Sequence, residues 1–147
     1  GGLLCGTVFV ATEESGAHDR YKEALLRADA ADTVITDRFP IGWPGRRHRV
    51  LRGPVTDSPE PLPSGFIAWT TVMGERRPVP RGSAAAPTVE AVGAVDEMAR
   101  YAGTGCGAVT RIRPAAEVVA ELGRAFRTAL GDGGAAEPAG TTRGAMA

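Results

Sequence analysis

The chain opens on an apolar run that limits the folds available to it. Residues 3–10 read Leu-Leu-Cys-Gly-Thr-Val-Phe-Val, apolar nearly throughout apart from one Gly-Thr pair. Such continuity indicates a strand buried on both faces rather than one that is half exposed. A buried strand needs neighbours on both sides to satisfy its backbone groups, and nothing apolar precedes this one. We therefore expect the sequence to be a piece of a larger parallel sheet.

The next segment has the spacing of an amphipathic helix. Residues 17–28 place apolar side chains at intervals of three and four, so one face should pack inward. Thr12 or Ser15 is the expected N-cap, because hydroxyl groups accept hydrogen bonds from the first helical N–H groups. The face consists of Tyr21, Ala24, Leu25 and Ala28.

Two further helices are expected in the second half of the chain. Residues 92–102 show a short helical pattern, with Val95, Met98, Ala99 and Ala102 on one side. The clearest pattern spans residues 114–130, where a proline suits the first turn and a glycine follows the last. Its apolar stripe consists of Ala115, Val118, Val119, Leu122, Phe126 and Leu130.

Between these helical segments the chain is broken by prolines and glycines. Residues 32–39 read as a short strand, and residues 47–52 alternate loosely enough for an exposed edge strand. Prolines recur from residue 53 to residue 83, so no regular structure is assigned there. Residues 132–147 hold only Met146 as a large apolar side chain, which predicts a disordered tail.

Charge and cysteine content exclude several classes of protein. Seventeen basic and seventeen acidic side chains cancel, so no global field recruits nucleic acid or acidic lipid. Two cysteines form no disulfide framework, and no apolar run approaches the length of a membrane span. We expect a cytoplasmic protein without nucleic-acid or membrane partners. The one basic cluster, at residues 46–52, lacks interleaved aromatics and is interpreted as a solvated edge strand.

Four side chains invite a catalytic interpretation that the local sequence disfavours. Glu13 and Glu14 are adjacent at a helix start, where carboxylates complement the helix dipole. His18 also lies early in that helix with no cluster of partners around it, which favours a surface or first-turn role. Cys106 has no neighbouring base or second thiol to activate it, so we expect a small buried residue.

Several segments together resemble the C-terminal third of the nitronate monooxygenase family. Residues 5–15, Cys-Gly-Thr-Val-Phe-Val-Ala-Thr-Glu-Glu-Ser, are similar to a family motif of Gly-Thr-Arg-Phe-Leu-Ala-Thr-x-Glu-Ser type. The order and approximate spacing of the other segments also agree, and together they cover most of residues 2–130. These further segments are residues 17–26, 32–36, 44–52, 97–109 and 114–119.

The resemblance implies an α/β fold and a flavin cofactor. Family members are (β/α)₈ TIM barrels that hold FMN at the C-terminal ends of the strands. By this resemblance the chain is a C-terminal fragment of such a barrel: residues 1–30 the last strand and its helix, 31–131 a mainly helical cap, 132–147 the tail. The implied FMN-binding residues are Gly6 and Thr7 at the phosphate, and Gly103, Thr104 and Gly105 near the flavin ring.

The resemblance also implies oxidation of alkyl nitronates with oxygen. Two departures from the family pattern affect the expected cofactor site and activity. Val8 stands where the family motif has arginine, which removes a charge near the phosphate. The residues that match the family's catalytic histidine region are missing, so no catalytic residue is assigned and the isolated chain should be inactive. The alternatives are a flavin-dependent enoyl-acyl carrier protein reductase relative, or a non-catalytic remnant that serves as an interaction module.

Overall fold

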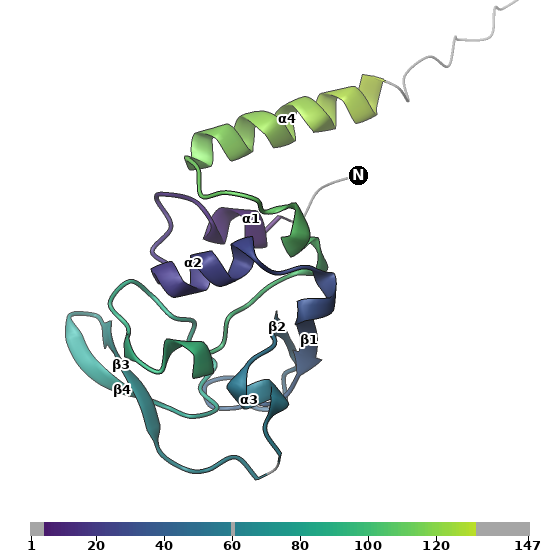
Figure 1. Ribbon diagram of the computed structural model, residues 1–147. Helices are drawn as coiled ribbons and strands as arrows, with labels where there is room; N and C mark the ends of the chain where they lie inside the picture. Colours follow the sequence, from purple (N-terminus) through teal and green to yellow (C-terminus); the bar gives the residue numbers. More distant parts are fainter. Residues whose placement is uncertain (1–4, 60, 132–147) are drawn as a thin grey trace, which may run out of the picture. The chain divides into compact units, whose positions relative to one another are not determined.

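A computed structural model describes residues 5–59 and 61–131, which form two compact units, one up to Ala115 and one from Ala116 onward. Figure 1 shows the elements. In chain order they are α1 Thr7–Val10, α2 Asp19–Leu26, the 3₁₀ helix η1 Ala30–Asp32, β1 Thr33–Thr36, β2 His48–Leu51, α3 Pro54–Asp57, β3 Phe66–Val72, β4 Glu75–Pro80, β5 Val92–Gly93, the 3₁₀ helices η2 Val95–Glu97 and η3 Thr104–Ala108, and α4 Ala115–Gly131.

The opening segment is helical where a strand was expected. Residues 7–10 form α1, in which the N–H groups of Phe9 and Val10 both donate to the carbonyl oxygen of Gly6, at 3.1 and 3.3 Å. The prediction of a strand is therefore wrong for this part, because these backbone groups are satisfied by a local turn instead of a neighbouring strand. Residues 3 and 4 lie outside the described part of the chain.

Helix α2 confirms the predicted inward face and corrects its start. Tyr21 and Leu25 are buried, and Ala24 and Ala28 pack against the same cluster. The N-cap is His18, whose Nδ1 accepts a hydrogen bond from the Arg20 N–H at 3.1 Å. The predicted cap was wrong because the hydroxyls of residues 12 and 15 make hydrogen bonds outside the helix, to the Phe9 carbonyl and from the Ala17 N–H.

Strands β1 and β2 pair antiparallel, with Thr33 opposite Leu51 and Thr36 opposite His48. A strand was predicted at each place, and both are present. The second strand is buried rather than exposed, since Val50 is 0% exposed and packs with Phe39, Val55 and Ala99. The loose alternation of basic and apolar residues misled the prediction because the apolar positions point into a core while the arginines remain at its rim.

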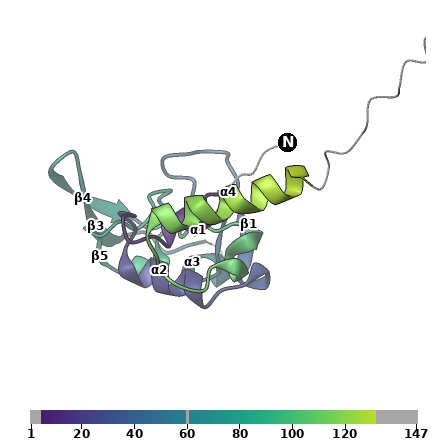
Figure 2. The same cartoon turned by 90° about the horizontal axis from the view of Figure 1, so that it is seen from above.

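The region from residue 53 to residue 83 is ordered, which corrects the expectation that it lacks regular structure. It contains α3 and a hairpin of β3 and β4, which run side by side in Figures 1 and 2. Met73 and Gly74 both have positive φ, 54° and 81°, as a two-residue hairpin turn of type I′ requires. Pro78 and Pro80 are tolerated because β4 lies at the edge of the three-stranded sheet β4-β3-β5.

Residues 92–102 are not a helix, although the predicted side chains are buried. The segment contains β5 and η2, and Val95, Met98, Ala99 and Ala102 are all at most 3% exposed. Gly93 explains the extended start: its φ is +130°, and a Cβ there would lie 2.6 Å from the Ile67 carbonyl oxygen. After residue 30 small sheets accompany the helices, so this region is mixed.

The second unit contains α4, which confirms the helix predicted over residues 114–130. Val118 is buried, whereas Val119, Phe126 and Leu130 are 58%, 38% and 60% exposed. The predicted tail at residues 132–147 lies outside the described residues. The α/β class is confirmed as a mixed fold with small sheets. The described residues form no closed barrel, and derivation from one stays a prediction, as does the three-part division of the chain.

Candidate functional site

The predicted cofactor residues come from two distant segments that meet in the first unit. The Thr7 side chain accepts a hydrogen bond from the Gly103 N–H, with 2.8 Å between Oγ1 and N, across 96 positions of sequence. Gly103 is the residue before η3, and Thr104 and Gly105 form the first turn of that 3₁₀ helix. The structure therefore brings together the two groups of residues that the resemblance assigned to FMN.

The hydrogen bond leaves the Thr7 hydroxyl able to serve a ligand. A threonine hydroxyl has one O–H donor and two acceptor lone pairs, and the Gly103 N–H occupies one lone pair. The O–H hydrogen is thus directed away from Gly103, and Thr7 is only half-buried. Gly6 and Gly105 are exposed, and a Cβ at either position would meet nothing within 4 Å. Space for a ligand remains on both sides of the junction.

Glycine at position 103 suits this contact. A Cβ there would lie 3.4 Å from Thr7 Oγ1, at van der Waals contact with the atom that accepts the Gly103 N–H. The turn is anchored from beneath by Cys106, which is 0% exposed and packs among Tyr21, Leu25 and Leu51. Its thiol donates to the Asp29 carbonyl at 3.1 Å. The prediction that Cys106 is a small buried residue is confirmed.

Among the described residues that the resemblance assigns to FMN, hydrogen-bonding groups are present and none has a positive side chain. Thr7 offers its hydroxyl, Gly6 leaves the backbone open, and Val8 supplies no charge. Neutral donors alone bind an anion more weakly than an arginine fork does. The residues present therefore fit one side of a phosphate contact, and Thr104 and Gly105 are exposed beside it.

Glu14 and His18 have structural contacts rather than a shared acid–base arrangement. Glu14 Oε2 accepts from the Ala115 N–H at 2.8 Å, and this hydrogen bond lowers the pKa of the Glu14 carboxyl below its ordinary value. The acidic pair was expected to complement the start of the helix that follows it, but Glu14 instead caps the first residue of α4. His18 caps α2, as its predicted first-turn role requires.

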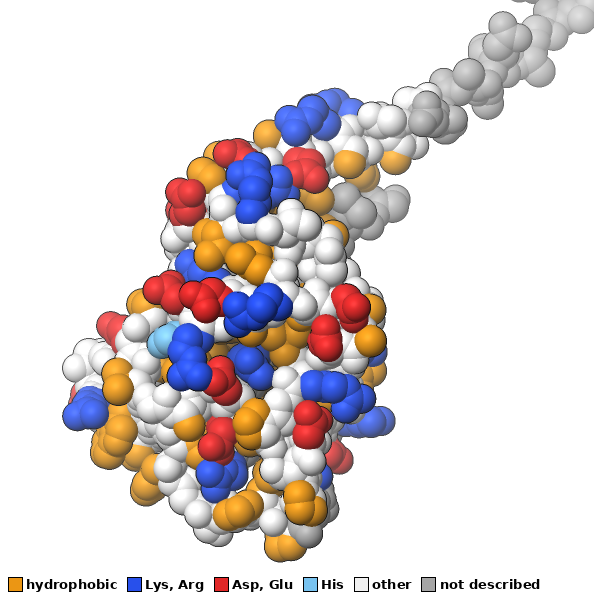
Figure 3. Space-filling model, in the orientation of Figure 1, with side chains coloured by type: hydrophobic (Ala, Val, Ile, Leu, Met, Phe, Trp, Pro, Cys, Tyr) orange, Lys and Arg blue, Asp and Glu red, His pale blue; other side chains and the backbone are white. Residues whose placement is uncertain are grey.

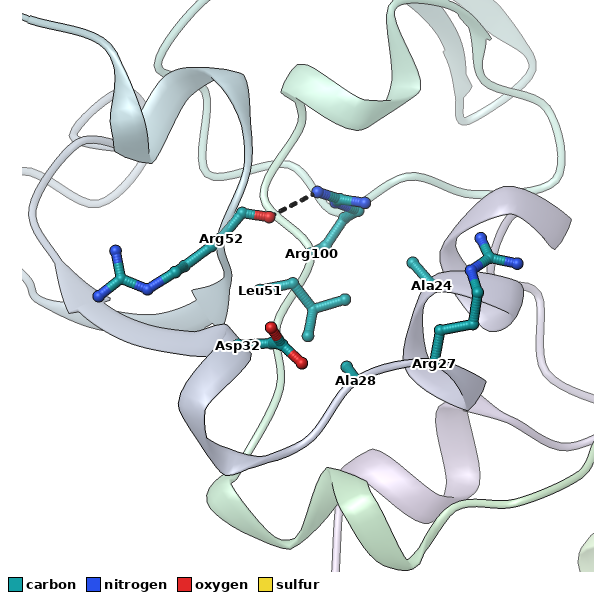
Figure 4. A pocket seen from close by; sticks show the side chains of 7 residues that line it. All are labelled: Ala24, Arg27, Ala28, Asp32, Leu51, Arg52 and Arg100. Atoms are coloured by element: carbon teal, nitrogen blue, oxygen red, sulfur yellow. Dashed lines mark hydrogen bonds between the residues drawn. The ribbon is translucent and has the colours of Figure 1, made fainter.

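A hollow of about 310 Å³ lies between α2, β2 and Arg100, and Figure 4 shows the side chains around it. Its floor is apolar, and the Arg27 and Arg52 side chains point away from it. Arg100 donates to the Arg52 carbonyl at 2.9 Å, and burial lowers the pKa of its guanidinium. Asp32 accepts from the Asp29 N–H. Because these polar groups already serve the fold, the hollow provides no set of free ligands.

Sequence reasoning missed an aromatic contact beside the basic cluster. Trp43 stacks on His48 with 5.3 Å between ring centroids, and His48 meets the edge of Tyr101 at 5.5 Å. The sequence contains a signal for this arrangement. A Pro-Gly pair between Trp43 and Arg46 predicts a tight turn, which brings Trp43 close to the basic residues that follow the turn. The basic cluster is therefore not free of aromatics.

Two classes of site are absent from the described ranges. Within residues 5–59 and 61–131, no three His, Cys, Asp or Glu side chains are grouped so that they could hold a metal ion. None of the helices in the described part has the length and apolar character needed to cross a membrane. Figure 3 shows acidic and basic side chains interspersed on the face it presents.

Comparison with known proteins bears on most of the chain. The profile of the nitronate monooxygenase family matches residues 1–124. A "Probable nitronate monooxygenase" of Staphylococcus haemolyticus is 47% identical over 38 residues, which cover 26% of this chain and 11% of that relative. No solved structure matches the chain significantly. The family match includes both segments of the Thr7–Gly103 junction and extends over far more than half of the sequence. The chain belongs to the nitronate monooxygenase family.

Proposed function

We propose that this chain forms one side of the FMN site of a nitronate monooxygenase-type oxidoreductase. The observation that supports this most is the hydrogen bond between Thr7 and Gly103, which joins two segments within the family match. When bound, FMN supplies the electron transfer between an alkyl nitronate and oxygen. The substrate, the oxidant and a cytoplasmic location belong to this proposal, since the curated relative is matched over 11% of its length.

The residues of this chain bind and orient rather than catalyse in this proposal. The Gly103 N–H occupies one lone pair of Thr7 Oγ1, so the hydroxyl hydrogen would be available to a phosphate oxygen of FMN. Gly6 would let the phosphate approach the backbone, and Gly103, Thr104 and Gly105 are exposed, so they would lie beside the flavin. No described residue is assigned as the proton acceptor, so we expect the isolated chain to be inactive toward nitronates.

The alternatives receive less support. The family profile that matches residues 1–124 is that of the nitronate monooxygenases, which favours this reading over an enoyl-acyl carrier protein reductase. A non-catalytic interaction module would retain the fold without any preference for a phosphate. Phosphate-dependent flavin binding therefore separates that alternative from the proposal.

The test compares the binding of FMN with that of riboflavin, which lacks the phosphate. Flavin fluorescence is titrated with the full chain, its Thr7→Val variant and its Thr7→Ser variant. We expect a preference for FMN that falls about tenfold in Thr7→Val, because a hydrogen bond to a charged group contributes about 1.5 kcal/mol. Thr7→Ser keeps the hydroxyl and should retain the preference. An FMN preference that is the same in Thr7→Val and in the unaltered chain would refute the phosphate role of Thr7.

A further inference from the structure

The turn at residues 43–46 has a geometry fixed by its sequence. The Arg46 N–H donates to the Trp43 carbonyl at 3.3 Å, and Gly45 has a φ of +69°. Proline in the second position and glycine with positive φ in the third are the signature of a type II turn. The indole of Trp43 and the guanidinium of Arg46 are therefore presented from the two ends of one rigid turn.

Both flanks of this turn are tied to the first unit. Ile41 donates its N–H to the Gly82 carbonyl at 3.1 Å and accepts from the Ala84 N–H at 2.8 Å. On the other side the chain enters β2 at His48. A loop held at both ends loses less conformational entropy when a ligand binds it, so the surface is pre-organised.

Trp43 is supported on one side and open to solvent elsewhere. Its ring lies nearly parallel to that of His48, with an angle of 17° between the planes. His48 in turn contacts the edge of Tyr101, whose hydroxyl donates to the Ala84 carbonyl at 2.7 Å. His48 is only 8% exposed, whereas Trp43 is 58% exposed. The structure thus holds an indole in a fixed orientation on a buried aromatic base.

The positive charge beside this indole is not neutralised. Arg46 and Arg47 are exposed, and with Trp43 and His48 they line a hollow of about 430 Å³. Other arginines form ion pairs with carboxylates, among them Arg20, Arg27, Arg52, Arg77, Arg81 and Arg100. Neither Arg46 nor Arg47 does so within the part of the chain that the structure describes. Their local field attracts anions even though the net charge of the chain is zero.

A buried polar atom in the wall of the hollow also lacks a partner. His48 Nε2 is shielded from solvent and makes no hydrogen bond among the described residues. Buried nitrogen atoms without a partner are rare and costly in native structures. The unpaired nitrogen belongs to a residue that lines the hollow, while the exposed groups that a ligand reaches there are Trp43, Arg46 and Arg47.

We propose that residues 43–48 bind a nucleoside monophosphate, with its base stacked on Trp43 and its phosphate held by Arg46 and Arg47. Any base offers a π face to an indole, and guanidinium groups bind phosphate oxygens through paired N–H donors. The hollow is within the size range of small-molecule pockets, and a single stacking ring suits one nucleotide rather than a strand. This site shares no residue with the proposed FMN contact at Thr7.

The test uses the fluorescence of Trp43 in the full chain. The sequence has two tryptophans, so a Trp69→Phe background leaves Trp43 as the only reporter. The ligands are AMP, adenosine, ribose 5-phosphate and inorganic phosphate, which separate the contribution of the base from that of the phosphate. We expect AMP to quench the emission with a Kd on the order of 0.1–1 mM, and the other three ligands to bind at least about tenfold more weakly.

Matched variants locate the phosphate contact. In the same background, Arg46→Ala with Arg47→Ala should raise the Kd for AMP about tenfold and leave that for adenosine unchanged. Arg76→Ala with Arg77→Ala removes the same charge from the edge strand β4 and should change neither Kd. Thr7→Val should leave AMP binding intact, so a failure of the FMN proposal is recognised separately.

Several results would contradict the proposal of a nucleoside monophosphate site at residues 43–48. AMP and adenosine of equal affinity would exclude a phosphate contact, and equal losses in the two double variants would reduce it to general charge attraction. Tighter binding of a short single-stranded oligonucleotide than of AMP would replace the mononucleotide by nucleic acid as the ligand. An emission of Trp43 that no ligand changes would remove the stacking surface altogether.

Discussion

Helices α2 and α4 were predicted from the same kind of apolar spacing, yet they differ in how much of the apolar face is buried. The eight residues of α2 bury Tyr21, Lys22 and Leu25, whereas the seventeen residues of α4 bury only Val118. Most of the predicted stripe of α4 is exposed, including Phe126 and Leu130. Periodicity thus identifies a helix and its apolar face, but the burial of that face depends on what the rest of the protein supplies.

The largest expected effect is the loss of unfolding free energy when a leucine of α2, rather than a leucine of α4, is changed to alanine. Leu25 is 0% exposed and Leu130 is 60% exposed, and both changes to alanine remove the same atoms. Leu25→Ala should lower the free energy of unfolding by about 3 kcal/mol, because it leaves a cavity. Leu130→Ala should cost less than about 0.5 kcal/mol. Urea unfolding followed by circular dichroism measures both, and a similar loss in Leu130→Ala would show that α4 is covered after all.

A smaller effect is expected from the polar atom on the buried face of α2. The Tyr21 hydroxyl donates to the Tyr101 carbonyl, so Tyr21→Phe should cost about 1 kcal/mol at neutral pH. Burial also raises the pKa of Tyr21 above its ordinary value. A raised pKa in the folded state means that the stabilisation is complete below the ordinary pKa of about 10 and declines as the pH rises above it.

The free energies of unfolding of the unaltered protein and of Tyr21→Phe should therefore converge in alkaline solution. Between neutral pH and about pH 10.5, the unaltered protein should lose more of its free energy of unfolding than Tyr21→Phe does. Burial raises the pKa of Tyr101 as well, which affects both proteins alike. Parallel pH profiles of the two proteins would contradict the assignment of this decline to Tyr21.

The smallest effect concerns the start of α4, where Glu14 accepts the hydrogen bond of the Ala115 N–H. That hydrogen bond lowers the pKa of Glu14, so its contribution is present above the ordinary pKa of glutamate and is lost as the pH falls through the lowered value. The amide proton shift of Ala115 in NMR spectra should titrate with this lowered pKa. The titration should vanish in Glu14→Gln and persist in Glu13→Gln; its persistence in Glu14→Gln would rule out the cap.

Between residues 92 and 102, the buried side chains were predicted correctly from the sequence, but the helix that was expected to present them is absent. Spacing of three and four identified Val95, Met98, Ala99 and Ala102, because buried positions of an irregular segment can follow the same intervals as a helix. What the spacing did not reveal was the close approach of Gly93 to the carbonyl of Ile67, a contact between distant segments that imposes an extended backbone. Single-sequence patterns contain no information on such contacts.

The hairpin of β3 and β4 was missed for a related reason. Pro78 and Pro80 argue against a strand, but an edge strand leaves some of its N–H positions unused, so proline does no harm there. Met73 has a φ of 54°, which cannot be predicted from its residue type because positive φ is uncommon outside glycine. Strand position and turn geometry are set by the neighbouring chain, not by the local composition.

The candidate site was predictable only in part. Gly6, Thr7, Gly103, Thr104 and Gly105 were named from the family resemblance, and no local pattern indicates that Thr7 and Gly103 touch. The conformation of the first segment was predicted wrongly, because apolar residues 7–10 suit a strand and a short helix equally well. The Trp43 turn has a local signal in the Pro-Gly pair that follows the tryptophan, whereas its stacking on His48 depends on the fold.

The pairing of Thr12 with Arg113 brings two distant parts of the first unit side by side. The two form an isolated bridge, and the Glu13 N–H donates to the Arg113 carbonyl at 3.2 Å. The bridge is parallel and closes the chain between the two residues into one long loop, whose closure costs conformational entropy that the packing within the loop must offset.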